Sequence, residues 1–170
     1  ILKGFELDES DFSELSDFAK RENIIFLSTP SSIDDVNFLA KIKVPAFKIS
    51  SGDLTNIPLL EHISLKKKPI LLSTGMGNFK EISLAIESIT KKHNNKIAIL
   101  HSISGYPTPS NEANLNVINS LKNKYSFPIG YSDNGSGIDV SSIAVAAGAK
   151  LIEKHFTLDK KMIGPDHKMS

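Results

Sequence analysis

Six short apolar segments alternate with helical patterns along most of this 170-residue chain. The segments span residues 24–29, 46–50, 69–74, 96–102, 127–132 and 149–156. The helical patterns, with apolar residues at three- and four-residue spacing, span residues 12–19, 33–42, 56–65, 79–90, 112–121 and 138–147. Strands that alternate with helices predict a parallel sheet, because each parallel crossover is normally a helix. We therefore predict an α/β fold of six β/α units.

Several predicted helices carry end signals. Ser32 and Asn78 each precede a helical pattern, and an acid follows each three residues later, at Asp35 and Glu81. This spacing is typical of a capping box, in which the two side chains bond each other's backbone. Gly148 follows the last pattern and is suited to a helix end.

Polar and reactive residues stand where nearly every predicted strand ends. They are Ser28, Thr29, Lys48, Ser50, Ser51, Ser73, Thr74, His101, Ser102, Ser132, Asp133, Glu153, Lys154 and His155. A (β/α)₈ TIM barrel builds its active site at the C-terminal ends of its strands, with about 31 residues per unit. A doubly wound sheet is the alternative, but no glycine fingerprint follows the first strand. We predict an incomplete TIM barrel with its site at these strand ends.

The composition argues against several classes of partner. The chain has 20 basic and 19 acidic residues and no basic stripe, which argues against nucleic-acid binding. It has no cysteine, so a disulfide framework and a thiolate metal site are both excluded. Its apolar runs fall short of the ~20 residues that span a membrane, and no signal peptide opens it. We predict a soluble, cytoplasmic protein without a membrane or nucleic-acid partner.

Five motifs together resemble the sialic acid synthase family. They are FKISSGDLTNIPLLEHI (47–63), KPILLSTGMGN (68–78), YPTP (106–109), IGYSDNGSG (129–137) and GAKLIEKHFTLDKKMIGPDH (148–167). The family includes N-acetylneuraminate, legionaminate and pseudaminate synthases and spore-coat polysaccharide relatives. The resemblance implies that residues 1–170 are a partial TIM-barrel synthase domain holding family strands three to eight. The first two strands and a small C-terminal antifreeze-like domain are then absent.

The resemblance also implies an activity. Members of the family condense phosphoenolpyruvate with an N-acetylmannosamine-type sugar, giving a nine-carbon 2-keto sugar acid and free phosphate. A divalent metal, Mn²⁺ or Mg²⁺, activates the aldehyde of the open-chain sugar. Such a protein is expected to be a homodimer when full length. Which amino sugar it uses is left open.

Further implied roles concern the phosphoenolpyruvate site. Lys48 and Ser51 match family residues that contact the phosphate or the carboxylate of phosphoenolpyruvate. Lys48 is also predicted to be a catalytic residue. Thr29, Ser104 and Ser132 match further substrate contacts, although the strand end before Ser104 departs from the family's usual pattern. Lys48 also stands out by itself, because a lysine inside an apolar run is normally avoided unless its charge is used.

The sugar and metal positions follow from the same resemblance. Asp53 and Asp166 match acidic catalytic positions near the sugar, and Tyr106 matches a sugar contact. His155 matches one of two metal-ligating histidines. The second histidine is replaced here by Asn134, whose amide oxygen is a weaker ligand for transition metals than imidazole.

Other interpretations of these residues stay open at this stage. Lys48 could be a surface lysine, Asp53 a turn residue, His101 a hydrogen-bonded core residue, and Asn134 part of an ordinary Asn-Gly turn. A Schiff-base pyruvate aldolase with Lys48 or Lys154 as nucleophile is the rival enzyme. A non-catalytic sugar-phosphate-binding homologue is the other alternative.

Overall fold

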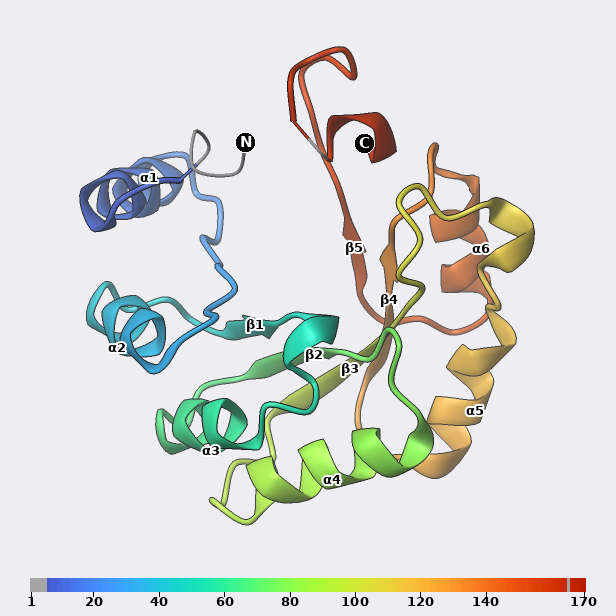
Figure 1. The fold of residues 1–170 in the computed structure, drawn as a ribbon, viewed down its shortest axis with the longest axis horizontal. Helices are drawn as coiled ribbons and strands as arrows, with labels where there is room; N and C mark the ends of the chain where they lie inside the picture. The colour runs from blue at the N-terminus through green and yellow to red at the C-terminus, as the bar shows by residue number, and fades with distance from the viewer. Residues whose placement is uncertain (1–5, 165) are drawn as a thin grey trace.

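Five parallel strands form one curved sheet in the computed structural model, which describes residues 6–164 and 166–170 (Figure 1). The strands are β1 (Phe47–Ile49), β2 (Ile70–Ser73), β3 (Ile97–Ser102), β4 (Ile129–Asp133) and β5 (Ile152–Lys154). They lie in the order β1-β2-β3-β4-β5, and every neighbouring pair is parallel. The predicted parallel α/β sheet is therefore confirmed.

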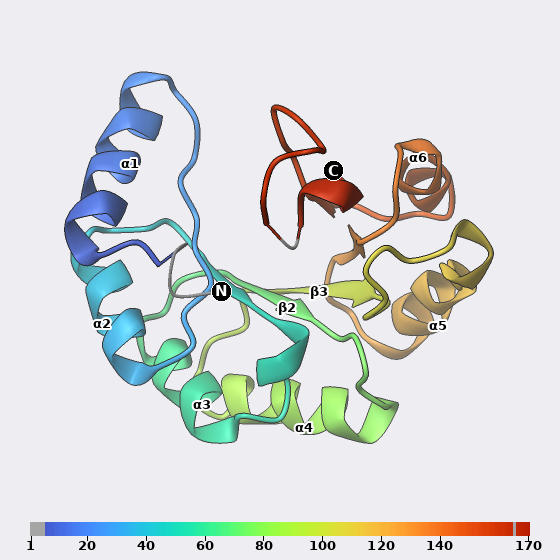
Figure 2. The ribbon, with the colours of Figure 1, turned by 45° about the horizontal axis from the view of Figure 1, so that its top comes forward.

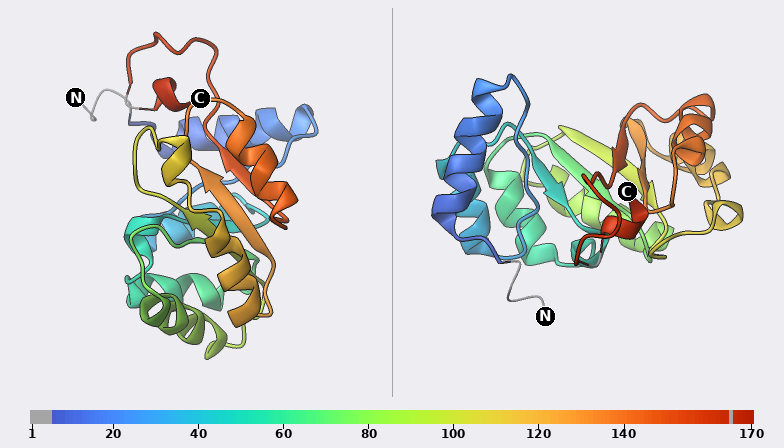
Figure 3. Two further views of the ribbon diagram at one scale, coloured as in Figure 1. Left: turned by 90° about the vertical axis from the view of Figure 1, so that its right-hand side faces the viewer. Right: turned by 90° about the horizontal axis from the view of Figure 1, so that it is seen from above.

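Six α-helices accompany the sheet in the described part of the chain. They are α1 (Glu9–Arg21), α2 (Ile33–Lys41), α3 (Ile57–Leu65), α4 (Phe79–Thr90), α5 (Asn116–Lys124) and α6 (Asp139–Ala146). Figure 2 shows them in an arc around one side of the sheet, and Figure 3 shows α1 and α6 at opposite ends of that arc. None of the helices in residues 6–164 and 166–170 is long and apolar enough to span a membrane.

The capping signals are confirmed. Ser32 and Asn78 are the N-caps of α2 and α4, and each forms a reciprocal capping box with the acid three residues later. Gly148 follows α6 with a φ of +102°, in the left-handed region that glycine adopts without strain. The helix predicted from residue 112 begins later, at Asn116, because Ser110–Glu112 forms a separate 3₁₀ turn.

The strand predicted over residues 24–29 is not confirmed, so the sheet has five strands where six were predicted. The segment is extended, but a single backbone hydrogen bond, from Lys48 N to Ser28 O at 3.4 Å, joins it to β1. Ile24 and Ile25 are 65% and 73% exposed. Phe26 packs against the core, but one long hydrogen bond does not make a sheet ladder.

The hydrophobic core lies between the sheet and the helices. Its members include Phe47, Ile49, Leu60, Ile63, Ile70, Leu72, Ile89, Ile99, Ile118 and Tyr131. Successive residues of a strand point to opposite faces, so the residues between these core positions face the other side of the sheet. Lys48, between buried Phe47 and Ile49, is one of them.

The face away from the helices is closely packed around β4. A Cβ at Gly130 would lie 2.7 Å from the backbone oxygen of Leu151 and 2.5 Å from a methyl group of Leu100. Only glycine fits between these neighbours without a shift of the backbone. Ser132, two residues later on the same face, pairs in register with Glu153 of β5.

Candidate functional site

Lys48 reaches across the curved face of the sheet. Its Nζ donates to Ser73 Oγ of β2 at 2.8 Å and to the Ile49 carbonyl at 3.1 Å, and it lies 3.4 Å from Glu153 Oε2. Lys48 belongs to the first strand and Glu153 to the fifth, so this contact requires a sheet that curls like part of a barrel. The Lys48 side chain is only 13% exposed, which excludes the interpretation as a surface lysine.

Glu153 also contacts β4. Its second carboxylate oxygen, Oε1, accepts a hydrogen bond from Ser132 Oγ at 3.3 Å. We call Lys48, Ser73, Ser132 and Glu153 the lysine corner. Burial lowers the pKa of the Lys48 ammonium, and the charge of Glu153 partly offsets that effect. The lysine corner is therefore a buried cation paired with a carboxylate, with one hydroxyl group from β2 and one from β4.

Three loops at the strand ends bring further hydroxyl groups together beside β2. The backbone N–H of Gly75 donates to Ser51 Oγ at 2.9 Å. A Cβ at Gly75 would lie 2.7 Å from Ser51 Oγ and 2.8 Å from Ser104 Oγ, so both hydroxyl groups pack closely against this glycine. The predicted contacts Ser51 and Ser104 thus converge on one backbone position, two residues after Ser73.

A second group of predicted residues gathers at the ends of β4 and β5. His155 Nε2 lies 3.2 Å from Asn134 Oδ1, and His155 Nδ1 lies 4.0 Å from Asp166 Oδ2. The rings of Tyr106 and His155 meet edge to face with centroids 6.2 Å apart. We call Tyr106, Asn134, His155 and Asp166 the histidine corner. The two residues predicted as metal ligands are therefore neighbours.

Hydrogen bonds from its amide nitrogen hold the Asn134 side chain in place. Its Nδ2 donates to the Ile103 carbonyl at 2.8 Å and to Ser102 Oγ at 3.3 Å, which turns Oδ1 toward His155. One imidazole and one amide oxygen fit a divalent ion that takes most of its other ligands from water or substrate. In the described residues, no group of three or more His, Cys, Asp or Glu side chains is arranged to hold a metal ion.

Asp133 is a buried residue to which the sequence analysis gave no role. Its carboxylate accepts from Ser141 Oγ at 2.6 Å and from Gly135 N at 2.8 Å, and it lies 3.3 Å from Lys154 Nζ. Lys154 also donates to the Gly135 carbonyl at 2.8 Å. This network ties the loop after β4 to α6 and β5, next to Asn134. An acid at the end of an apolar strand was the signal that pointed to it.

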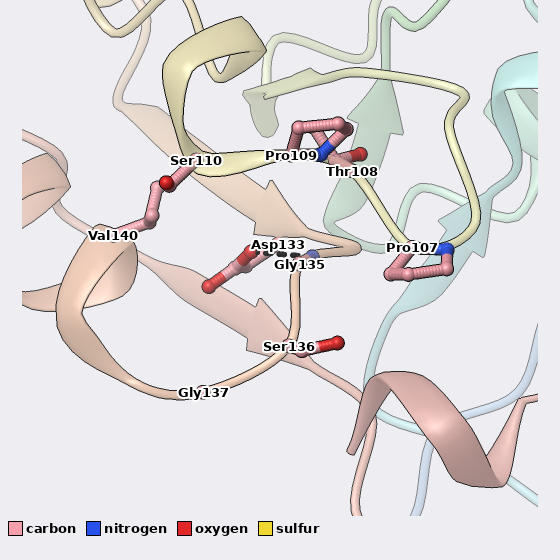
Figure 4. A pocket seen from close by; sticks show the side chains of 9 residues that line it. All are labelled: Pro107, Thr108, Pro109, Ser110, Asp133, Gly135, Ser136, Gly137 and Val140. Atoms are coloured by element: carbon pink, nitrogen blue, oxygen red, sulfur yellow. Dashed lines mark hydrogen bonds between the residues drawn. The ribbon is translucent and has the colours of Figure 1, made fainter.

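Asp133 also lines a hollow between two loops. Figure 4 shows its side chain between the loop after β3 and the loop after β4, and the dashed line marks its bond to Gly135. The lining residues are Pro107, Thr108, Pro109, Ser110, Asp133, Gly135, Ser136, Gly137 and Val140. None of these lining residues has a basic side chain.

Three remaining residues lie away from both corners. Asp53 accepts from Ser50 Oγ at 2.9 Å and from Asn56 Nδ2 at 3.1 Å, within the turn before α3. Thr29 is exposed and lines a separate hollow beside α1 and α2. His101 is buried, a ring nitrogen lies 2.9 Å from the Ala113 carbonyl, and burial lowers the pKa of its imidazole. His101 is thus a hydrogen-bonded core residue.

Comparison with known proteins agrees with this architecture. The sequence model of the NeuB family matches residues 1–170. An N,N'-diacetyllegionaminic acid synthase of Campylobacter jejuni is 46% identical over 172 residues, which cover all of this chain and 52% of the relative. One from Legionella pneumophila is 40% identical over 171 residues, covering 98% of this chain and 48% of the relative. The chain spans about half the length of these curated relatives.

Solved structures agree as well. The N-acetylneuraminic acid (sialic acid) synthetase of Leptospira borgpetersenii, in complex with citrate, superposes with a TM-score of 0.94 at 39% identity. The match covers 97% of this chain and 57% of that one. A truncated 3-deoxy-D-arabino-heptulosonate 7-phosphate synthase of Thermotoga maritima, 21% identical, has the same fold with a TM-score of 0.84. From the family match and these relatives, the chain belongs to the NeuB family.

Proposed function

We propose that the protein containing this chain condenses phosphoenolpyruvate with an N-acetylmannosamine-type sugar, giving a nine-carbon 2-keto sugar acid and free phosphate. The relatives named above that are about 40% identical or more are synthases of sialic or legionaminic acids, which supports a role in sugar-acid biosynthesis. The observation that carries the proposal is the lysine corner. A buried ammonium that is bonded to Ser73, with Ser132 bonded to its partner Glu153, is suited to an anionic group of phosphoenolpyruvate.

The remaining hydroxyls extend the same site. Ser51 and Ser104 lie together against Gly75, where phosphate oxygens could accept from both hydroxyls. Binding would fix phosphoenolpyruvate so that its C3 attacks the aldehyde carbon of the sugar. Water then adds at C2, and phosphate leaves by cleavage of the C–O bond. Thr29 and Asp53 are proposed here as further substrate contacts from the resemblance alone.

The histidine corner is proposed as the sugar and metal side of the site. His155 and Asn134 would hold Mn²⁺ or Mg²⁺, which would supply a Lewis acid for the aldehyde oxygen. Asp166 and Tyr106 would contact the sugar. Asp166, with an exposed carboxylate near the other nitrogen of His155, would also orient that ring.

A Schiff-base aldolase remains the second candidate, because one observation favours it. A buried lysine with a lowered pKa is a suitable amine nucleophile. In this chain, however, Lys48 Nζ is held by Ser73, Ile49 O and Glu153, whereas Lys154 is paired with Asp133. These contacts favour a charged, binding lysine over a free amine.

Two measurements separate the candidates. The protein is incubated with phosphoenolpyruvate, Mn²⁺ and a panel of N-acetylated hexosamines, and phosphate release and product mass are followed. We expect phosphate release that depends on one sugar of the panel. A second sample receives pyruvate and borohydride. A stable adduct on Lys48 or Lys154, together with no phosphate release, would replace the synthase with an aldolase.

The proposal extends to the whole polypeptide. Because the relatives are about twice as long, we propose that residues 1–170 form part of a barrel domain. The first two strands of the barrel and an antifreeze-like domain would then come from sequence outside these residues, with residues 24–29 in the position of the third strand. The full-length protein would be a homodimer. The full-length reading frame and light scattering of its product test this part.

A further inference from the structure

Glu153 lies where an anionic ligand of the lysine corner would have to bind. One of its carboxylate oxygens lies 3.4 Å from Lys48 Nζ, and the other accepts from Ser132 Oγ at 3.3 Å. The carboxylate therefore bridges two groups that the proposed function assigns to phosphoenolpyruvate. Two anions cannot share this position without strong repulsion, because like charges at close range in a partly buried site repel strongly.

Lys48 has no spare donor for a second anion. An ammonium has three N–H groups, and here it has three partners: Ser73 Oγ, Ile49 O and Glu153. The Ile49 carbonyl is fixed in β1, and Ser73 lies on the neighbouring strand. Glu153 makes the longest of the three contacts, and its side chain is 44% exposed. Glu153 is therefore the partner that can leave at the lowest cost.

We propose that Glu153 is a displaceable counter-ion of Lys48, which occupies the anion position in the empty site and gives way when a phosphate or carboxylate group binds. This inference rests on the proposed function, since it assumes that Lys48 receives an anion. In the empty site the carboxylate compensates a cation that would otherwise be buried without a partner. The bound anion takes over that task, and Glu153 turns toward solvent.

If Glu153 competes with the ligand, removing its charge should strengthen the binding of phosphoenolpyruvate and phosphate. Glu153→Gln keeps the size of the side chain but removes its charge. We expect the Kd for phosphoenolpyruvate and for inorganic phosphate to fall about three- to tenfold, the size expected when a partly exposed ion pair no longer competes. Because Glu153 is half exposed, the variant should fold.

The experiment is calorimetric titration of the longest native polypeptide that contains this chain, without metal. Glu153→Gln is compared with the unmodified protein and with Glu87→Gln. Glu87 pairs with Lys91 on the exposed surface of α4, so this control makes the same change in net charge away from the sheet. Its Kd values should equal those of the unmodified protein. Glu153→Ala, which also removes the charge, gives a second and independent measurement.

The possible outcomes are distinct. Tighter binding in both Glu153 variants and unchanged binding in the control support the counter-ion. Equal or weaker binding in the Glu153 variants, when the unmodified protein binds phosphoenolpyruvate, overturns it and leaves the proposed function in place. If the unmodified protein and all variants bind neither probe, both the counter-ion and the proposed function are overturned.

Discussion

The lysine corner and the histidine corner both involve β4 and β5 but are built differently. Lys48, Ser73, Ser132 and Glu153 all stand in strands, and the register of the sheet fixes where each side chain points. In the histidine corner, Tyr106, Asn134, His155 and Asp166 all lie outside the strands. The proposed anion site therefore stands on strands, whereas the proposed metal site stands on loops.

Burial separates the two corners further. The Lys48 side chain is 13% exposed, whereas the side chains of His155 and Asp166 are 27% and 57% exposed. Asn134 is the exception, because it is buried and its amide nitrogen donates to Ile103 O and Ser102 Oγ. The side chain of Asn134 is thus fixed by hydrogen bonds, whereas Asp166, the carboxylate next to His155, is largely exposed.

The largest expected effect tests the Asp133 network, which ties the loop after β4 to α6 and β5. Asp133→Ala removes one partner of a buried ion pair and leaves Lys154 without its carboxylate. We expect a loss of about 3–5 kcal/mol in the free energy of unfolding, measured in urea. Glu87→Ala breaks an exposed pair and should cost less than about 1 kcal/mol.

A second variant checks the mechanism of that loss. Asp133→Ala combined with Lys154→Met removes both charges, so it should be more stable than Asp133→Ala alone. If the single variant loses no more than the Glu87→Ala control, the network does not anchor the loop after β4. The histidine corner would then lack a fixed backbone as well.

The next effect concerns the lysine corner. Lys48→Ala should weaken binding of phosphoenolpyruvate by about 10- to 150-fold, or roughly 1.5–3 kcal/mol, because a charge-assisted contact is lost. Titration of phosphoenolpyruvate measures this, with the exposed Lys91→Ala as control. The affinity for Mn²⁺ measured without substrate should stay unchanged. An unchanged affinity for phosphoenolpyruvate would remove Lys48 from the site.

Local signals predicted much of the fold. The capping boxes at Ser32 and Asn78 set the starts of two helices, and their partners lie only three residues away. The parallel order of the strands followed from the alternation with helices. A capping box depends on residues close together in the sequence, and a pair of parallel strands depends on one helical crossover. A local pattern of residues is therefore enough to predict both.

Features that depend on the curvature of the sheet could not be predicted. Lys48 and Glu153 are 105 positions apart in number, and their contact exists only because the first and fifth strands approach across the concave face. Likewise, the composition of residues 24–29 is that of a strand, yet Ile24 and Ile25 are exposed and the segment forms no ladder. Strand formation depends on packing partners as much as on composition.

A smaller effect is expected when the histidine corner is made more like a preformed metal site. Asn134→His would supply a second imidazole, and we expect Mn²⁺ to bind roughly tenfold more tightly. With Asn134, oxygen-rich ligation should favour Mg²⁺ or Mn²⁺ over softer ions. Titration of both ions into the two proteins measures these preferences. Equal Mn²⁺ affinities would mean that Asn134 is not at the metal.

The smallest effect is a pH dependence of stability from His101, which belongs to neither corner. Burial lowers the pKa of its imidazole below the ordinary 6.5, and the contact with the Ala113 carbonyl only partly opposes this. The unfolded chain therefore binds the proton more readily than the folded protein. The stability that His101 contributes is complete above pH 6.5 and is lost as the pH falls through the lowered pKa.

Urea unfolding between pH 7.5 and about 5 measures this loss. A single titrating group can change the free energy of unfolding by at most about 1.4 kcal/mol per pH unit. His101→Gln removes the imidazole, so its stability should fall less steeply with acid than that of the unmodified protein. The exposed His93→Gln is the matched control for the loss of one histidine. Parallel curves for His101→Gln and the unmodified protein would mean that His101 takes up no proton on unfolding.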